Sequence, residues 1–192
     1  MFSKRLFDLF FVIPGLLLLA PVLLLIALFI KIKDGGNVLF KQIRVGQHGK
    51  HFEVLKFRTM VLDAEKLGNK VTTGDDPRIT PIGHILRKYK FDELPQLINV
   101  LKGEMSLVGP RPEVPEYVEF YPDEVRNIVL SVPPGMTDKA SIEFVNENEL
   151  LSGSADPVND YKNKVLPIKL DYYVDYVKSR SLYSDFTLIH SF

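Results

Sequence analysis

An uncharged, apolar stretch near the start of the chain, Leu9–Ile30, constrains the fold more than any other feature. Most of its residues are Leu, Ile, Val or Phe, and its length matches the roughly 20 residues that an α-helix needs to cross the hydrocarbon core of a bilayer. The rest of the sequence has the mixed polar and apolar character of a globular domain. We therefore expect residues 1–34 to form a membrane-anchoring helix and residues 35–192 to form a separate cytoplasmic domain.

The end of the apolar stretch indicates a retained anchor. It runs into Lys31-Ile-Lys33 without the small-residue step at which a secretory signal peptide is cut. Basic residues flank both ends, because Lys4-Arg5 precede the stretch, so the positive-inside rule gives no preferred direction. Two arrangements stay open. Hydropathy alone favours a single span, whereas Pro21, near the middle, fits a helix that bends there and returns both ends to the cytoplasmic side.

Composition removes several classes of function. Lys and Arg together number 24, as do Asp and Glu, so no excess of positive charge draws the chain to nucleic acid. The chain has no Cys, which excludes disulfides and Cys-based metal sites, and its four His show no metal-ligand spacing. No Gly-rich nucleotide loop of the P-loop or Rossmann type occurs.

Local patterns predict a mainly α fold with a small β-hairpin, an α+β class with amphipathic surface helices. Two β-rich runs, 38–45 and 52–59, flank a turn at 46–50 and predict the hairpin. The remaining patterns predict helices over 60–67, 80–89, 92–101, 116–131 with a break at Pro122, and 156–178, a strand over 141–145, and a surface segment over 182–192.

Two adjacent carboxylates, Asp92 and Glu93, stand at the start of one predicted helix. We interpret Asp92 as the N-cap, followed by Glu93 in the first turn and by Pro95 where its missing N–H costs little. There the positive end of the helix dipole favours an ionised acid and a nearby phosphate. Each acid alone is more often a cap or a first-turn charge, so the pair by itself leaves both a structural and a catalytic role open.

Cationic residues suited to a phosphate substrate lie around this pair in the sequence. Lys56 and Arg58 alternate on one predicted strand and so face the same side, although each alone is more often a surface residue. Arg87 precedes the acids by five positions. Arg111 lies between Pro110 and Pro112, whose restricted backbones hold it extended, and a rigid Arg suits two-pronged phosphate binding.

The stretch Asp92-Glu-Leu-Pro-Gln-Leu-Ile-Asn-Val-Leu-Lys-Gly-Glu-Met-Ser-Leu-Val-Gly-Pro-Arg-Pro-Glu113 strongly resembles the bacterial sugar transferases, the monotopic phosphoglycosyl transferases. The resemblance extends over nearly the whole chain and is closest to the small form of the family. Its other segments are Lys4-Arg-Leu-Phe-Asp8, Lys56-Phe-Arg-Thr-Met60, Pro134-Gly-Met-Thr137 and Leu170-Asp-Tyr-Tyr173.

The resemblance implies a reaction. Such enzymes move a sugar-1-phosphate from a UDP-sugar to a polyprenyl phosphate such as undecaprenyl phosphate and release UMP, through a covalent aspartyl intermediate. This is the first membrane step of glycoconjugate synthesis, which makes downstream glycosyltransferases further partners. The implied location is the cytoplasmic face of the bacterial inner membrane, with an anchor that re-enters the lipid and is broken at Pro21.

The same resemblance implies roles for individual residues. Asp92 matches the nucleophile, and Glu93 matches the residue that binds Mg²⁺ or assists the acceptor. Asp171 matches a family acid near the site and is a second expected metal ligand, although it could equally be a helix-surface charge. The expected substrate-binding residues are Lys56, Arg58, Arg87, Pro110, Arg111 and Pro112.

Two departures from the family pattern bear on these expectations. Ala20 stands where the family has Ser before Pro21, and Asp138 follows Pro134-Gly-Met-Thr137 where the family often continues Gly-Trp. The second departure leaves the sugar open. Two other functions remain as alternatives: a glycosidase with two carboxylates, which neighbours in sequence fit poorly because such acids lie at least about 5 Å apart across a bond, and a membrane-anchored scaffold without activity.

Overall fold

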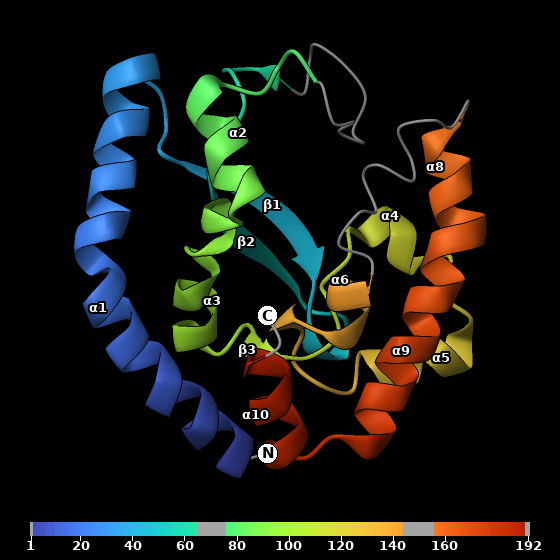
Figure 1. Ribbon diagram of the computed structural model, residues 1–192. Coiled ribbons are helices and arrows are strands. Elements are labelled where there is room, and N and C mark those ends of the chain that lie inside the picture. The colour runs from blue at the N-terminus through green and yellow to red at the C-terminus, as the bar shows by residue number, and fades with distance from the viewer. Residues whose placement is uncertain (1, 65–75, 144–155, 191–192) are drawn as a thin grey trace.

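The computed structural model describes residues 2–64, 76–143 and 156–190 (Figure 1). Its longest element is α1 (Phe2–Asp34), which stays helical through Pro14 and Pro21 and curves along one edge of the molecule. The segment Phe2–Lys33 is long and apolar enough to cross a membrane. Its most apolar stretch of 18 residues has a mean hydropathy of 2.9, and only 6% of that stretch is buried. Most of α1 therefore presents apolar side chains outward, which suggests association with a membrane.

The opposite face of α1 packs on the rest of the protein. Near its start, Val12 belongs to a buried cluster with Val54, Leu97, Val100 and Met105. Near its end, Ile26 and Ile30 belong to a second cluster with Phe57 and Leu86. Each such burial is worth roughly 1.5–3 kcal/mol, so the helix is held at both ends.

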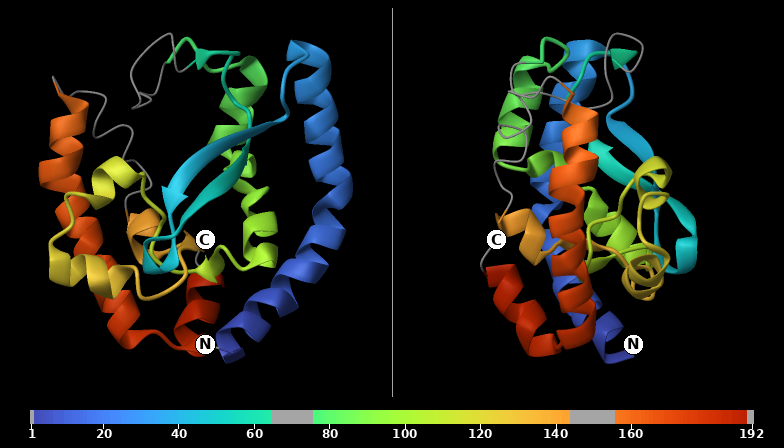
Figure 2. Two further views of the ribbon diagram at one scale, coloured as in Figure 1. Left: turned by 180° about the vertical axis from the view of Figure 1, so that it is seen from behind. Right: turned by 90° about the vertical axis from the view of Figure 1, so that its right-hand side faces the viewer.

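The predicted hairpin is confirmed. Strands β1 (Leu39–Val45) and β2 (His51–Phe57) pair antiparallel, with Leu39 opposite Phe57 and Val45 opposite His51. The turn contains a short 3₁₀ segment, η1 (Gln47–Gly49), in which Gly49 has a φ of 74°, a conformation open to glycine. Figures 1 and 2 show the hairpin between α1 on one side and the C-terminal helices on the other.

Local signals placed several helix ends correctly. Helix α2 (Pro81–Lys88) begins after Thr80, whose hydroxyl accepts a 3.0 Å hydrogen bond from the Gly83 N–H. Helix α3 (Gln96–Lys102) ends at Gly103, which has a φ of 87°. The predicted break at Pro122 separates α4 (Pro115–Val118) from α5 (Asp123–Val129).

The helix predicted over 60–67 is wrong over 60–64, and 65–67 lie outside the described residues. Met60 forms an antiparallel bridge with Ile79. The backbone N–H of Thr80 donates to Thr59 O, and that of Val61 donates to Arg78 O. These groups are therefore committed to a neighbouring segment and cannot bond along a helix.

The strand predicted over 141–145 is also wrong where it can be seen. Residues 139–143 form helix α6 (Lys139–Glu143), and 144–145 lie outside the described residues. The Asp138 carboxylate accepts hydrogen bonds from the Ser141 N–H (2.9 Å) and hydroxyl (2.5 Å). Asp138 thus caps a helix start, which overrides the β-propensity of the following side chains.

A pair of short parallel strands was missed by the sequence patterns. Strand β3 (Ser106–Val108) lies beside β4 (Gly135–Thr137), with Ser106 opposite Gly135. Just beyond β3 the two backbones approach so closely that a Cβ on Gly135 would lie 2.1 Å from Gly109 N. Only glycine allows this crossing.

The predicted helix over 156–178 forms as one long rod with a wider turn inside it. Helix α8 (Pro157–Asp160), the π-helical turn η4 (Tyr161–Val165) and α9 (Leu166–Ser179) follow one another directly. After Ser181, helix α10 (Leu182–His190) returns beside the N-terminal end of α1. The Phe11 and Phe186 rings, 6.5 Å apart, mark that contact.

Candidate active site

The acidic pair, Asp92 and Glu93, does not cap α3, so the N-cap interpretation of Asp92 is wrong. Both residues lie in a separate 3₁₀ turn, η3 (Phe91–Glu93), and Pro95 occupies the cap position of α3 without a side-chain hydrogen bond. Lys90, with a φ of 54°, turns the chain into this segment one residue after Tyr89 ends α2. Adjacent side chains in a 3₁₀ turn point about 120° apart, so the two acids diverge.

Glu93 is enclosed by cations from two other elements. Lys56 Nζ, on β2, lies 2.8 Å from Glu93 Oε1. Arg111 approaches with both arms, since Nη1 donates to Oε2 at 3.1 Å and Nη2 donates to Oε1. The fold therefore brings Lys56, Glu93 and Arg111 together from distant parts of the sequence, as a two-pronged pair and a second amine.

Asp92 has a different environment. Its carboxylate is partly buried, and none of the ion pairs within the described residues involves it. Burial raises the pKa of Asp92, Glu93 adds to the increase, and Lys56 and Arg87 oppose it. Glu93 is thus ion-paired on both oxygens, whereas Asp92 forms no ion pair in the described part of the chain but lies close to cations.

The charges at the site sustain one another. Burial by itself raises the pKa of Glu93, but Arg111 and Lys56 outweigh burial and hold it well below the usual range. Glu93 in turn raises the pKa of Arg111. Burial lowers the pKa of Lys56, an effect that Glu93 opposes. Glu93 is therefore ionised at neutral pH and keeps its partners charged.

Arg87 is held by a hydrogen bond to Thr59. Its Nε donates a 2.8 Å hydrogen bond to the Thr59 hydroxyl at the end of the hairpin, and burial lowers its pKa while Asp92 opposes that decrease. Arg58 is buried at the base of the hairpin, where a Cβ on Gly36 would lie 2.2 Å from its Nη1. Within the described part of the chain, no ion pair links Arg58 to either acid.

The segment Pro110–Arg111–Pro112 is fastened by its backbone. Pro110 O accepts a 2.9 Å hydrogen bond from the Gly135 N–H. Pro112 O accepts a 3.1 Å bond from Arg44 Nη1. Both prolines are buried, whereas the Arg111 side chain extends from this segment to Glu93. The expectation that the prolines hold Arg111 in an extended conformation stays a prediction.

Sequence reasoning missed the support beneath Arg111. The buried Glu113 carboxylate accepts a 2.5 Å bond from the Tyr161 hydroxyl and lies 3.4 Å from Arg44 Nη1. Glu113 closes the long sequence motif, so its position there was a signal, but nothing local connects it with Arg44 or Tyr161. These contacts join β1, the proline segment and η4.

That Glu93 and Asp171 together hold a metal ion stays a prediction. Asp171 is exposed on α9. Across the described ranges, no group of three or more His, Asp or Glu side chains could hold a metal ion. Mg²⁺ usually takes one or two protein carboxylates together with substrate phosphates and water. The acidic pair fits that mode, although a metal ion at Glu93 would compete with Lys56 and Arg111.

The sequence profile described as "Bacterial sugar transferase" matches residues 1–191. The chain belongs to the bacterial sugar transferase family. The resemblance seen in the long motif is thereby confirmed, and the chain is an enzyme, a transferase. Neither alternative, the glycosidase or the inactive scaffold, accords with membership of this family.

Three curated relatives illustrate the similarity. Exopolysaccharide production protein ExoY of Sinorhizobium fredii is 40% identical over 76% of this chain and 70% of its own length. Undecaprenyl-phosphate galactose phosphotransferase of Salmonella typhimurium is 38% identical over 98% of this chain but 39% of its own length. UDP-N-acetylgalactosamine-undecaprenyl-phosphate N-acetylgalactosaminephosphotransferase of Aeromonas hydrophila is 35% identical over 98% of this chain and 42% of its own length.

Proposed function

We propose that this enzyme transfers a sugar-1-phosphate from a UDP-sugar to a polyprenyl phosphate and releases UMP, with Asp92 as the nucleophile. Two relatives carry undecaprenyl phosphate in their names as well as a sugar donor or sugar product, which supports the acceptor class. The observation that carries the assignment of Asp92 is its partly buried carboxylate, which forms no ion pair among the described residues, next to a Glu93 that Lys56 and Arg111 occupy.

The first step forms the covalent intermediate. An oxygen of Asp92 attacks the phosphorus that bears the sugar, the bond from that phosphorus to the UMP oxygen breaks, and its electron pair leaves with UMP. Burial strips water from the Asp92 carboxylate, while Lys56 and Arg87 favour its ionised form. The same cations suit the negative charge of the donor phosphates.

The second step restores the enzyme. A phosphate oxygen of the polyprenyl phosphate attacks the same phosphorus, and the bond to Asp92 breaks, so the carboxylate is regenerated and the lipid carries a diphospho-sugar. Splitting the transfer in two lets the nucleotide leave before the lipid reacts. In this scheme the phosphate of the polyprenyl acceptor reaches the catalytic domain at the membrane surface.

Mg²⁺ belongs to this proposal as the cofactor. Glu93 would hold it jointly with donor phosphate oxygens once Lys56 and Arg111 turn towards those phosphates. When bound, it would neutralise phosphate charge during the displacement. Asp171, exposed on α9, is the second proposed ligand.

The anchor is proposed to re-enter one leaflet with both ends on the cytoplasmic face of the bacterial inner membrane. The packing of α1 supports this arrangement, since Val12 in its first half and Ile30 near its end both lie in clusters with residues of the soluble elements. A helix that crosses the bilayer would leave its two ends on opposite sides, so packing of both halves of α1 on one domain favours re-entry.

A screen of UMP release across UDP-sugars, with undecaprenyl phosphate as acceptor and Mg²⁺ present, tests the proposed reaction and identifies the donor. The expected result is release with at least one UDP-sugar and transfer of label from its sugar to the lipid. Release of free sugar in place of labelled lipid would show hydrolysis and contradict the proposal.

Glycosyltransferases that extend the product are the proposed downstream partners.

A further inference from the structure

The first turns of α1 bind the end of α3. Arg5 Nη2 donates to Leu101 O at 2.6 Å, and its Nη1 donates to Val100 O. The last carbonyls of a helix lack partners within the helix and carry its negative dipole end, so a guanidinium is well suited to them. Helix α3 follows the acidic pair closely, beginning at Gln96.

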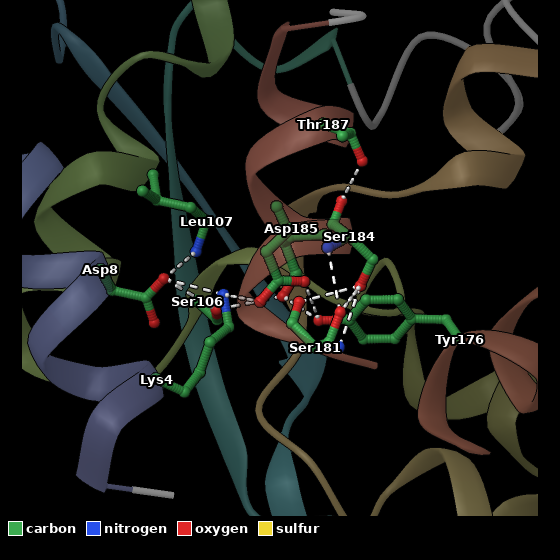
Figure 3. A network of polar contacts seen from close by, with 10 residues as sticks. Lys4, Asp8, Ser106, Leu107, Tyr176, Ser181, Ser184, Asp185 and Thr187 are labelled. Carbon is green, nitrogen blue, oxygen red and sulfur yellow. Dashed lines mark hydrogen bonds and ion pairs between the residues drawn. The ribbon is translucent and has the colours of Figure 1, made fainter. Parts of the chain in front are cut away.

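One turn further along α1, Asp8 binds β3 (Figure 3). Its Oδ1 accepts hydrogen bonds from the Ser106 hydroxyl at 3.1 Å and from the Leu107 N–H at 3.2 Å. Only 2% of Asp8 is exposed, so its charge is directed away from lipid and into the protein. Strand β3 ends two residues before Pro110 and three before Arg111.

Lys4 balances the charge of Asp8 and also contacts a third element, α10. Lys4 Nζ lies 3.0 Å from Asp8 Oδ1 and 3.0 Å from Asp185 Oδ2, on α10. Asp185 is equally buried and accepts a 2.9 Å hydrogen bond from the Tyr176 hydroxyl. The Tyr176 oxygen is also 3.0 Å from Val108 O. Both carboxylates therefore connect to β3, one directly and one through Tyr176.

We propose that Arg5 and Asp8 are positioning residues of the catalytic centre, because one short stretch of the anchor holds both the helix behind the acidic pair and the strand before Arg111. By fixing α3 and β3 relative to each other, they set how Arg111 meets Glu93. This inference rests on the proposed function, in which that meeting place receives the donor phosphates. A displacement of about 1 Å at such a site can cost on the order of 100-fold in rate.

Basic residues at the start of a membrane helix have an alternative use, the binding of lipid headgroups. The observed contacts favour positioning, since Arg5 is directed at backbone carbonyls and Lys4 at two buried carboxylates. A role limited to lipid binding predicts loss of activity in vesicles only. A positioning role predicts the same loss in detergent micelles, where no bilayer has to be held.

The test measures kcat and KM for UMP release in both detergent micelles and vesicles. Arg5→Gln should lower kcat by about 10- to 100-fold in both. Arg5→Lys should lower kcat less, because the lysine amine can still donate to one of the two carbonyls. Lys33→Gln, which removes an exposed anchor charge remote from α3, should stay within about twofold. Loss confined to vesicles, or equal effects of Arg5→Gln and Lys33→Gln, would overturn the inference.

Asp8 provides a matched pair of variants. Asp8→Asn keeps an oxygen that accepts from Ser106 and Leu107 and leaves Lys4 paired with Asp185, so its kcat should stay within about threefold of the parent protein. Asp8→Ala removes the acceptor and should lower kcat by at least about tenfold. Equal losses in the two variants would point to charge in place of geometry and contradict the inference.

Amide hydrogen exchange separates this inference from the proposed function. Exchange at the Leu107 N–H should quicken in Asp8→Ala and remain near the parent rate in Asp8→Asn, while unfolding midpoints followed by circular dichroism identify any variant that fails to fold. An unchanged exchange rate at the Leu107 N–H in Asp8→Ala would contradict the inference. If no UDP-sugar supports turnover in the parent protein, the proposed function fails, and exchange at Leu107 and Arg111 still decides whether Asp8 holds this strip.

Discussion

Arg111 donates to both carboxylate oxygens of Glu93, which lies 18 positions earlier in the chain. Lys56 adds a third contact to the same carboxylate, whereas Asp92, next to it in sequence, takes part in no such pair among the described residues. The two acids are therefore unequal. Glu93 holds the cations in place, and the Asp92 carboxylate, outside these ion pairs, is left for the substrate.

Replacing Asp92 by Asn should abolish the covalent intermediate. An amide of the same shape is a far poorer nucleophile than a carboxylate, and loss of a nucleophile costs enzymes on the order of 10³-fold or more. Intact-protein mass spectrometry after incubation with donor alone should show a sugar-phosphate adduct on the parent protein and none on the variant. An adduct of normal yield on Asp92→Asn would place the nucleophile elsewhere.

The pH dependence of the first step should report the environment of Asp92. Burial and Glu93 raise the pKa of Asp92, and the carboxylate must be ionised to attack, so UMP release should fall with decreasing pH above the range of an ordinary Asp. Omitting the acceptor keeps the titration of its phosphate out of the profile. Glu93→Gln removes a like charge and releases two cations, so this acid limb should move to lower pH. A limb that stays or rises would contradict the assignment.

Arg111→Lys should show that the two-pronged contact matters and not charge alone. Lysine cannot satisfy both oxygens of Glu93 and cannot grip a phosphate with two parallel bonds, so we expect kcat/KM for the donor to fall by about 10- to 100-fold. Initial rates over a range of UDP-sugar concentrations measure the change. The matched control is Lys41→Met, which breaks an exposed hairpin pair with Glu53 that is worth at most about 1 kcal/mol.

Asn99 should be important for stability. It is fully buried on α3, accepts from the Leu55 N–H at 3.0 Å and donates to Glu53 O and to Glu104, each at 2.7 Å. Asn99→Ala leaves the Leu55 N–H and the Glu53 carbonyl without these hydrogen-bond partners in the interior. It should lower the free energy of unfolding by about 2–3 kcal/mol. Thermal unfolding followed by circular dichroism tests this, with the exposed Asn163→Ala expected to unfold at the parent temperature.

The anchor arrangement can be tested by labelling, because the chain has no Cys of its own. Single cysteines at Ser3 and Lys33 should both react with a membrane-impermeant reagent from the cytoplasmic side if α1 re-enters one leaflet. Labelling from opposite sides would show a full span.

Sequence patterns predicted the parts of the fold that local chemistry decides. Thr80 at the start of α2 and Gly103 at the end of α3 act on their own neighbours, so a short window of sequence is enough to find them. The pattern failed where distant segments decide. Residues 59–61 pair with 78–80, and β3 meets β4 over only three residues each.

The candidate site divides in the same way. The motif and its cations were visible in sequence, and Lys56, Arg87, Arg111 and the acidic pair do lie around one centre. The cap interpretation failed because the left-handed Lys90 starts a separate turn. The contacts of Glu113 with Arg44 and Tyr161, and those of Asp8 with β3, join residues 48 to 99 positions apart, a separation that no local pattern encodes.

Helix α1 supplies Val12 to one buried cluster and Ile26 and Ile30 to another. Trimming the lipid-facing segment to obtain a freely soluble enzyme would therefore open the protein interior as well as remove its attachment. A chain beginning at Asn37 should aggregate or fold poorly even in detergent. A soluble variant would instead need polar substitutions on the outward face of α1, at exposed positions such as Leu17 and Leu24. The residues on its inward face would have to be kept.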